Sequence, residues 1–436
     1  MISHWSEFKG KKVVVMGLGL NGGGLGVTEF FAKLGAKVTV TDLKTKEQLA
    51  PTIKKLKKFS NIRYVLGGHK EDDFKHAHLV VKNPDVRRKS PYLEVAKKHG
   101  VPIHTEISLF FLWSPNTIIG ITGTKGKSTT TNLVRAILST RYRVHMGGNI
   151  GIPVLGFLQK AKKDDLVLLE LSSWQVESLK IIEKSPHIAV ITNIENDHLN
   201  TYDSFDDYAK AKKLIYAYQN PKDHLVLPKK LSHLKEEAVG KTHIFSYSKK
   251  LDQLLAKKKF QLLGRHMVEN AACAMAVGEI MQISSDEAIR ALVKVKPLFG
   301  RLEIVKRTPK AVWINDTCST APYSTEQSIS SFPKDSVILI TGGTDKKLPY
   351  EELARTINRG VRDLILLSGS ATEKLKSHLR RDFIETSSLK EAIGKARELV
   401  RRGDTVLFSP AAASFELFKN EFDRGEQFVS IVKKMR

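Results

Sequence analysis

The stretch GITGTKGKSTT at residues 120–130 decides the fold of this chain. An aliphatic run precedes it and a helical pattern follows it, as in loops that cradle phosphate between a strand and a helix. Lys127 can neutralise phosphate charge and Ser128 can bind Mg²⁺. The spacing departs from the usual pattern, because Ile121 occupies the first glycine position. The residues predicted to contact phosphate are Gly123, Thr124, Lys125, Gly126, Lys127, Ser128 and Thr129.

Three blocks of the sequence repeat the same order of an aliphatic run, a turn and a helical pattern. This order predicts parallel sheets built from βαβ units. Their first strands are expected at residues 12–16, 117–121 and 311–315. We therefore expect an α/β fold with three domains. These are a Rossmann-like domain at 1–113, a central P-loop ATPase domain with a parallel sheet at 114–299, and a C-terminal Rossmann-like domain at 300–436. Residues 220–262 are expected to form a short β-rich insertion before a helix at about 267–281.

Two other strands of the central block end in residues that suit the same phosphates. Glu170 ends the strand predicted at 166–171, and His198 follows the strand predicted at 187–193. Ligands collect at the carboxyl ends of parallel strands, so both residues are expected near the loop. Glu170 supplies a hard oxygen for Mg²⁺, and His198 can bind a second metal ion or phosphate. A loop histidine taken alone is more often a surface residue, but three strand ends that converge favour a site.

A second glycine-rich loop lies in the first block, where Gly17, Gly19 and Gly22 follow a strand and open a helix. Asp42 ends the next strand, as in dinucleotide-binding folds. The pattern itself supports only a diphosphate resting on a helix N-terminus, which a UDP-sugar satisfies as well as NAD. No hydride-transfer site is evident elsewhere, so a nucleotide diphosphate is favoured over NAD and over a purely structural turn.

The composition narrows the class of protein further. Among 436 residues, 71 Lys and Arg stand against 46 Asp and Glu, which gives a net charge of +25. The basic residues form short clusters throughout the chain, so a solvated surface is favoured over nucleic-acid binding. Cys273 and Cys318 form no disulfide framework or zinc ribbon, which fits a reducing cytoplasm. Without a signal sequence or membrane span, we expect a cytoplasmic protein that binds neither membrane nor nucleic acid and acts as a monomer.

Taken together, these motifs resemble the Mur ligase family, the ATP-dependent amino-acid ligases of peptidoglycan synthesis. The residues that carry the resemblance are GITGTKGKST from residue 120, GGNIGIP at 147–153, LELSSWQVE at 169–177, NIENDHL at 193–199 and GRHMVENAA at 264–272. In the C-terminal block, FGRLE at 299–303, NDT at 315–317 and SPAAASF at 409–415 look most like the members that add D-glutamate.

The resemblance implies a reaction and its cofactors. ATP would phosphorylate the carboxylate of UDP-N-acetylmuramoyl-L-alanine (UDP-MurNAc-L-Ala), and the amine of D-glutamate would attack the acyl phosphate. ATP and two Mg²⁺ ions are implied, with Ser128 and Glu170 holding one ion and His198 the other. Lys212 matches the lysine that the family carbamylates, although its neighbours Lys210 and Lys213 leave an ordinary surface lysine as the alternative.

The resemblance also implies the remaining site residues. Asn270, Arg301 and Asp316 would contact ATP, and Lys346, Ser414 and Phe415 would bind D-glutamate. The UDP substrate would contact Gly17, Leu18, Gly19, Leu20, Asn21, Asp42 and Asn149.

Three residues depart from the family pattern. They put the affinity for substrates and the choice of amino acid in question more than the class of reaction. They are Cys318 in place of a lysine, Met267 in place of an asparagine, and Glu421 where an aromatic residue is usual. Two of them, Cys318 and Met267, leave open a nucleotide-sugar-binding regulatory protein that has lost catalysis. The charge leaves open a nucleic-acid-dependent ATPase.

Overall fold

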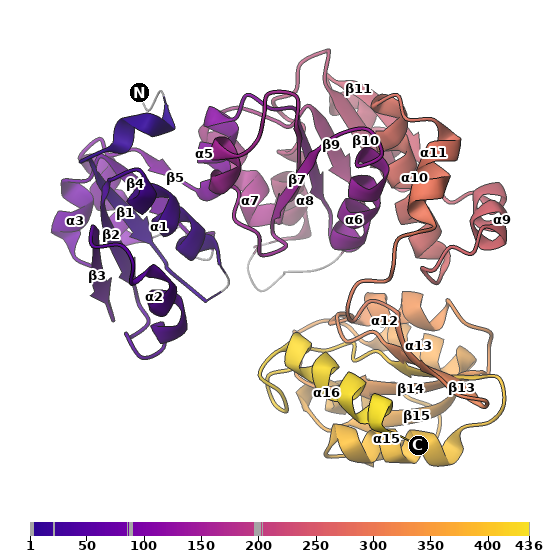
Figure 1. The fold of residues 1–436 in the computed structure, drawn as a ribbon. Coiled ribbons are helices and arrows are strands. Elements are labelled where there is room, and N and C mark those ends of the chain that lie inside the picture. The colour runs from indigo at the N-terminus through magenta and orange to yellow at the C-terminus, as the bar shows by residue number, and fades with distance from the viewer. Residues whose placement is uncertain are drawn as a thin grey trace. The chain divides into compact units, whose positions relative to one another are not determined.

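The structure is a computed structural model that describes residues 4–20, 22–84, 86, 90–195, 202 and 204–435. It contains three sheets with helices on their faces, which confirms the predicted three-domain α/β fold (Figure 1). By their internal contacts the residues form two compact units. The first unit comprises residues 1–194, 206–245 and 273–285, and the second comprises 195–205, 246–272 and 286–436. The predicted boundaries after residues 113 and 299 stay predictions.

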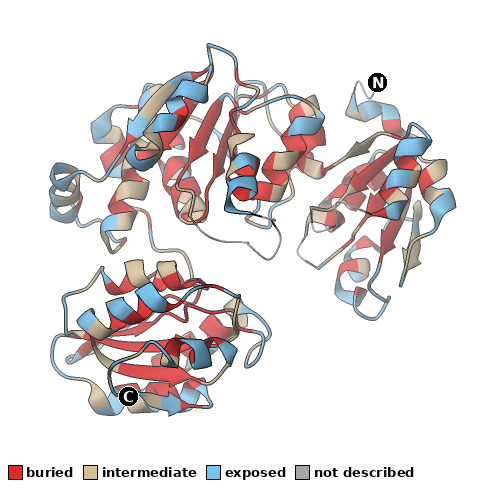
Figure 2. Ribbon diagram, turned by 180° about the vertical axis from the view of Figure 1, so that it is seen from behind, coloured by how far each residue is buried: buried red, intermediate tan, exposed pale blue. Residues whose placement is uncertain are grey.

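The first sheet is parallel, with the strand order β3-β2-β1-β4-β5. Its elements are η1 (Trp5–Phe8), β1 (Lys12–Met16), α1 (Gly23–Lys33), β2 (Lys37–Asp42), α2 (Ala50–Leu56), β3 (Ile62–Leu66), α3 (Glu71–Lys75), β4 (Leu79–Lys82), α4 (Pro91–Lys98), β5 (Ile103–His104) and α5 (Glu106–Trp113). Side chains alternate along β1. Val13 and Val15 pack with residues of α1 and α2, while Val14 and Met16 pack with residues of α3 and α4. The short aliphatic run is thus buried on both faces, as Figure 2 shows for the sheet strands.

The central sheet is also parallel and has the order β11-β10-β9-β6-β8-β7. The elements of this part of the chain are β6 (Ile118–Thr122), α6 (Lys127–Leu138), β7 (Val144–Gly148), η2 (Leu155–Gln159), β8 (Leu166–Glu170), α7 (Ser173–Glu177), η3 (Ser178–Ile181), β9 (Ile188–Ile191), α8 (Phe205–Lys213), β10 (His224–Pro228), η4 (Lys229–Glu237), β11 (Lys241–Phe245), α9 (Lys249–Lys257), α10 (Arg265–Ile280) and α11 (Ser285–Leu292). Strand β6 lies between β8 and β9. The three strand ends predicted to converge are therefore neighbours.

The third sheet has the order β12-β13-β17-β14-β15-β16, and its one antiparallel pair is β12 with β13. Its elements are β12 (Glu303–Arg307), β13 (Ala311–Asn315), α12 (Pro322–Ile329), β14 (Val337–Gly342), α13 (Glu351–Gly360), β15 (Val361–Leu367), α14 (Ser370–Lys376), β16 (Ile384–Thr386), α15 (Leu389–Leu399), β17 (Asp404–Phe408) and α16 (Glu421–Lys434). Ile340 and Phe408 on the central strands pack against Ile393 of α15 and Phe428 of α16.

The prediction for residues 220–262 was wrong. Strands β10 and β11 pair in parallel with β9 and with each other, so they extend the central sheet instead of forming an insertion. The rest of that segment is helical, as η4 and α9. Turn residues and lysines interrupt this stretch, and the strand pairing that holds it is not local in sequence. The helix expected next is present as α10.

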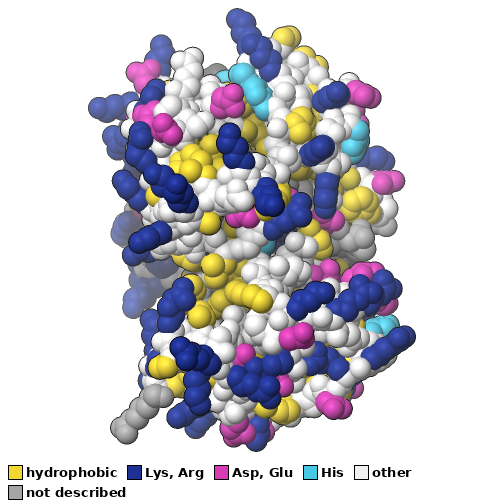
Figure 3. All heavy atoms as spheres, turned by 90° about the vertical axis from the view of Figure 1, so that its right-hand side faces the viewer, with side chains coloured by type: hydrophobic (Ala, Val, Ile, Leu, Met, Phe, Trp, Pro, Cys, Tyr) yellow, Lys and Arg dark blue, Asp and Glu magenta, His cyan; other side chains and the backbone are white. Residues whose placement is uncertain are grey.

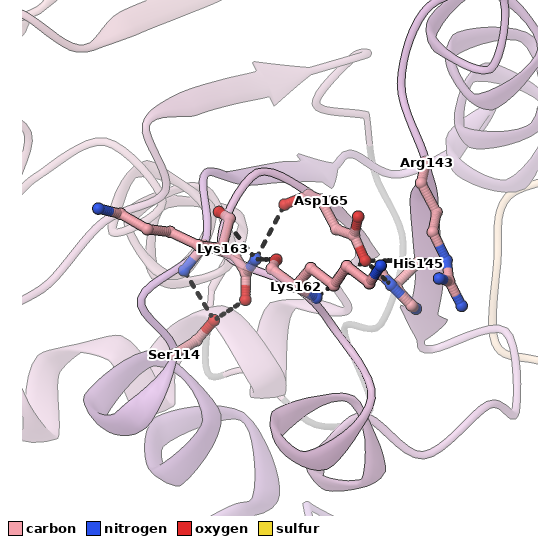
Figure 4. Close-up of polar contacts among 7 residues, drawn as sticks. Ser114, Arg143, His145, Lys162, Lys163 and Asp165 are labelled. Carbon is pink, nitrogen blue, oxygen red and sulfur yellow. Dashed lines mark hydrogen bonds and ion pairs between the residues drawn. The ribbon is translucent and has the colours of Figure 1, made fainter.

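A polar cluster closes the amino ends of the central strands, opposite the ends that carry the P-loop (Figure 4). The Asn116 side-chain amide donates to the carbonyl oxygens of Lys162 and Asp165, at 2.6 and 2.9 Å. The Asp165 carboxylate lies 2.8 Å from His145 Nε2, and this contact holds the pKa of Asp165 below its usual value. The cluster joins the loops before β6 and β8 and so positions these two strands. Phosphate is expected at the carboxyl ends of the strands, at the opposite edge of the sheet, so the cluster cannot contact it.

Basic side chains are spread over the surface. On the face shown in Figure 3, Lys and Arg side chains are numerous and widely spread, some of them next to one another, with fewer Asp and Glu side chains among them. Across the described residues, no helix is both long enough and apolar enough to cross a bilayer.

Candidate active site

The phosphate-binding loop connects β6 to α6, as the sequence predicts. Two of its glycines have backbone angles that favour glycine, with φ of +152° at Gly123 and +80° at Gly126. A Cβ atom at Gly123 would lie 1.9 Å from Thr192 Oγ1, so only glycine fits there. Asn193, which follows β9, accepts from the Lys125 N–H through its side-chain oxygen at 2.9 Å and from the Thr124 N–H through its carbonyl at 3.0 Å. The loop is thus fixed before any phosphate binds.

Two lysines converge on the same carbonyl of this loop. Lys127 Nζ and Lys212 Nζ each donate to the Gly123 oxygen at 2.9 Å, and Lys127 also donates to the Thr124 oxygen at 3.0 Å. Lys212 is 1% exposed, and its ammonium lies 4.5 Å from the centre of the Tyr208 ring. Lys212 is therefore a buried residue of the site and not a surface lysine. Two ammonium groups around one oxygen atom repel each other and attract an anion.

Glu170 ends β8 beside the loop and is 2% exposed. Its Oε1 atom accepts from the Asn149 side-chain amide at 2.9 Å. Its Oε2 atom is buried and has no hydrogen-bond partner among the described residues. A buried carboxylate oxygen that lacks a donor is costly, and a hard cation satisfies it. These residues therefore fit a magnesium ion bound to Glu170 Oε2.

Asn149 lies in the turn at residues 147–153, between β7 and η2. The turn closes on itself, because the Gly148 N–H donates to the Ile152 oxygen at 2.9 Å. The next two backbone N–H groups, those of Val154 and Leu155, donate to Glu106 Oε1 at 2.7 and 3.4 Å. Burial of its carboxyl group raises the pKa of Glu106 from 4.5 to about 7, although these two donors oppose the shift.

Glu106 makes the stability of the protein depend on pH. Its pKa is higher in the folded chain than in the unfolded one, so its contribution is complete below about pH 4.5 and is lost as pH rises through about 7. We expect Glu106→Gln to remove this loss. Relative to the variant, the wild type should lose about 2 kcal/mol of unfolding free energy between pH 5 and pH 8. Urea denaturation at both pH values measures the difference, and parallel pH dependences in the two proteins would contradict it.

The glycine-rich loop of the first sheet is held by Asp42. Gly17, Gly19 and Gly22 all have positive φ. Asp42 is 6% exposed, and its two carboxylate oxygens accept from the Gly19 N–H at 3.0 Å and the Lys44 N–H at 2.9 Å. In the structure Asp42 shapes the loop, while Leu20 is 54% exposed at its tip. Of the other predicted UDP contacts, Leu18 is buried, and Asn21 lies outside the described residues.

The remaining predicted site residues belong to the second unit. Asp316 is 3% exposed, and its carboxylate accepts from the Leu302 N–H at 3.1 Å and from the Ser328 and Ser409 hydroxyls at 2.6 and 2.7 Å. Burial raises the pKa of Asp316 against these donors. Asp316 thereby fixes the backbone next to Arg301. Its predicted contact with ATP stays a prediction.

The predicted D-glutamate residues lie on two loops that pair with each other. Thr344 and Ala413 form a β-bridge, and these residues come shortly before Lys346 and directly before Ser414. Ser414 is buried, whereas Phe415 is 72% exposed. Beneath the loops, Arg424 is fully buried and donates to the Ala412, Ala413 and Thr317 carbonyl oxygens at 3.1, 3.2 and 2.9 Å. Burial lowers the pKa of Arg424 to about 10.

The three departures from the family pattern have different surroundings. Met267 is 5% exposed, and its sulfur lies 3.8 Å from the Asn270 side-chain amide. Cys318 is half-buried, and burial raises the pKa of its thiol. Glu421 is the first residue of α16, and the next residue, Phe422, stacks on Phe299 with ring centres 6.5 Å apart. His198, predicted as a metal ligand, lies outside the described residues.

Comparisons with known proteins give matches over most of the chain. Family models match at residues 11–105 (Mur ligase MurD-like, N-terminal domain), 121–278 (Mur ligase middle domain) and 300–412 (Mur ligase, glutamate ligase domain). The chain belongs to the Mur ligase family. It is 40% identical to the UDP-N-acetylmuramoylalanine–D-glutamate ligase of Borreliella afzelii over 98% of both chains. It is 35% identical to the ligase of the same name from Clostridium tetani over the full length of both.

Solved structures of Mur ligases share the fold. The MurF ligase of Thermotoga maritima, in complex with ADP, matches 99% of this chain with a TM-score of 0.62 and 16% identity. A pseudomurein peptide ligase of type C from Methanothermus fervidus matches 98% with a TM-score of 0.59 and 19% identity. At this identity the likeness concerns fold alone.

Some of the residues that shape these loops and turns, each within its own unit, were not predicted from the sequence. Asn193 was quoted within a motif but assigned no role in fixing the P-loop. Glu106 and Arg424 were not singled out at all. An acidic residue at the start of an apolar helix is the only local signal for Glu106. For Arg424 there is none, because its partners lie about ten and about one hundred residues away.

Proposed function

We propose that this chain is the ATP-dependent ligase that joins D-glutamate to UDP-MurNAc-L-Ala in peptidoglycan synthesis. The observation that carries the proposal is the identity of 33–40% to ligases of this name, which extends over 97% or more of each chain. The match to a glutamate ligase domain at residues 300–412 supports it independently.

An amino-acid panel tests the proposal. With ATP and UDP-MurNAc-L-Ala supplied, D-glutamate should give a product heavier than the acceptor by one glutamyl residue, detected by mass spectrometry. L-Glutamate, L-alanine, L-lysine and diaminopimelate should each give none. A product with another member of the panel, but not with D-glutamate, would reassign the chain within the family.

The residues of the first unit support an acyl-phosphate mechanism. A carboxylate is a poor electrophile at neutral pH, and transfer of the γ-phosphoryl group of ATP supplies a leaving group. The backbone N–H groups of the fixed loop and the ammonium of Lys127 would hold the phosphates and stabilise the charge that develops. Bound Mg²⁺ would supply further charge neutralisation for this transfer. Ser128 and Glu170 are the proposed ligands of one ion, and His198 is the proposed ligand of a second ion.

The amine of D-glutamate would then attack the acyl carbon, and inorganic phosphate would leave from the tetrahedral intermediate. The attacking substrate carries two carboxylates, so its site needs a cation and neutral donors. Lys346 and the Ser414 hydroxyl are proposed for these contacts, with Phe415 beside them. Asn270, Arg301 and Asp316 are proposed on the ATP side.

The convergence of Lys127 and Lys212 on the Gly123 oxygen supports carbamylation of Lys212. Addition of CO₂ to the neutral amine forms an N–C bond and releases a proton, which turns the cation into a carbamate anion. The carbamate would remove the repulsion between two ammonium groups and would form an attractive pair with Lys127.

We expect Lys212→Ala to lower kcat by about 100-fold or more, because it removes a buried charge beside the reacting phosphate. Acetate or another small carboxylate should restore part of the lost activity, since it can occupy the vacated volume. Lys210→Ala is the matched control. Lys210 lies on the same helix, and its side chain is 76% exposed. Full activity of Lys212→Ala without added carboxylate would contradict the role.

We propose that the ligase acts as a monomer in the cytoplasm, with domain boundaries near residues 113 and 299. Analytical ultracentrifugation of the full chain checks the first of these, and limited proteolysis checks the boundaries.

A further inference from the structure

Glu106 accepts hydrogen bonds from the backbone beside the turn that carries Asn149. The reaction itself assigns Glu106 no part, but the geometry of the turn depends on this contact. Glu106 is the first residue of α5, and its carboxylate accepts from two successive backbone N–H groups, those of Val154 and Leu155. These residues lie where the turn at 147–153 passes into η2. The contact joins residues 48 and 49 positions apart in the sequence, so it ties the helix that ends the first block to the central domain.

The turn at 147–153 connects this contact to Asn149 and Glu170 of the candidate site. The Gly148 N–H donates to the Ile152 oxygen at 2.9 Å, which sets the two ends of the turn side by side. Between them, Asn149 donates twice to Glu170, from its backbone N–H to the carbonyl oxygen at 2.8 Å and from its side chain to Oε1 at 2.9 Å. Hydrogen bonds joined by short backbone segments, from Val154 to Ile152 and from Gly148 to Asn149, therefore connect Glu106 to the carboxylate of Glu170.

A second contact holds the same turn from the other side. Gly26 of α1 faces Pro153, and a Cβ atom at Gly26 would lie 2.3 Å from Pro153 Cβ. Helix α1 begins at the glycine-rich loop predicted to bind the UDP diphosphate. On η2, the Phe157 ring meets Phe110 of α5 at 6.3 Å between centres. The turn is thus held between the helix of the UDP loop and the helix that carries Glu106.

We propose that Glu106 is a positioning residue of the ligase, which holds the turn at 147–153 so that Asn149 meets the UDP acceptor. The inference rests on the proposed function and on the proposed role of Asn149. A carboxyl group suits this position because one of its oxygen atoms accepts two converging N–H groups. Glutamine retains an acceptor oxygen of the same reach, whereas alanine leaves both N–H groups without a partner.

Steady-state kinetics of Glu106→Ala and Glu106→Gln test the proposal. For the alanine variant we expect a rise of about tenfold or more in KM for UDP-MurNAc-L-Ala, with KM for ATP within about twofold of the wild type. The glutamine variant should rescue the acceptor KM to within about threefold. The matched control is Glu94→Ala, which removes an exposed glutamate from the first turn of α4 and should change neither constant.

A merely structural residue would give another result. Loss of Glu106 would then lower the melting temperature while the active fraction kept the acceptor KM, or it would raise both KM values alike, and either outcome overturns the proposal. If Glu106→Ala does not fold, Glu106→Asp supports the same comparison, because its shorter side chain withdraws the carboxylate from the Val154 N–H.

A double-mutant cycle with Asn149→Ala tests the route through the turn. If Glu106 acts through Asn149, the effects of the two substitutions on the acceptor KM should be clearly less than additive. Additive effects overturn the proposal. A normal acceptor KM in Asn149→Ala alone contradicts the role proposed for Asn149 and with it this route. An inactive wild type contradicts the proposed function instead.

Discussion

Replacing Lys127 with alanine should lower the rate of ADP formation by about 10³-fold or more. Lys127 is the first residue of α6, and its ammonium lies over the Gly123 and Thr124 carbonyl oxygens of the phosphate-binding loop. Its removal leaves the loop fixed by Asn193 but takes away the charge that would stabilise the transferred phosphoryl group, which is worth several kcal/mol. A coupled assay for ADP with both other substrates saturating measures the effect.

The control for this variant is Arg135→Ala, which removes an exposed cation from the same helix and should retain activity within about twofold. Circular dichroism and the melting temperature establish that both variants are folded. If folded Lys127→Ala turned over near the wild-type rate, the assignment of the loop as the ATP site would be wrong.

Glu170→Gln should abolish turnover to a similar extent. The glutamine oxygen can still accept from Asn149, so the turn stays in place, but an amide nitrogen replaces one of the two carboxylate oxygens. Oε2 is buried and has no partner in the part of the chain that the structure describes, so the substitution removes the charge that fits a magnesium ion there. We expect a loss of about 10³-fold that added Mg²⁺ does not restore.

Asp164→Asn is the matched control for Glu170→Gln, because Asp164 is an exposed carboxylate at the opposite end of the same strand. It should behave as the wild type over the same range of Mg²⁺. If Glu170→Gln merely shifted the Mg²⁺ requirement and kept its maximal rate, another residue would be the principal ligand.

The sequence predicted which strand ends of the central sheet lie side by side, because the candidate residues follow short aliphatic runs. Parallel strands with short connections place their carboxyl ends together, so the aliphatic runs before Gly123, Glu170 and Asn193 were enough to predict that they converge. The strand β7 was not predicted, since its last two residues are glycines and its first three are only half-buried. The turn that carries Asn149 was therefore assigned from the family resemblance and not from periodicity.

Residues that act through long-range contacts could not be predicted in the same way. The partners of Asp316 were not predicted, since its oxygens accept from Leu302, Ser328 and Ser409, which come from three separate segments. Glu106 likewise accepts from backbone N–H groups, and almost every residue type has such a group, so the sequence does not reveal the partner. Such partners are set by tertiary packing, and neither local propensity nor motif spacing encodes them.

We propose that this chain couples ATP cleavage to peptide-bond formation between two particular substrates. The most direct test is the release of inorganic phosphate from ATP with UDP-MurNAc-L-Ala and D-glutamate supplied separately and together. We predict rapid release only when both are present, at one phosphate for each UDP-MurNAc-L-Ala-D-glutamate formed. Release at the same rate when either substrate is omitted would contradict the claim.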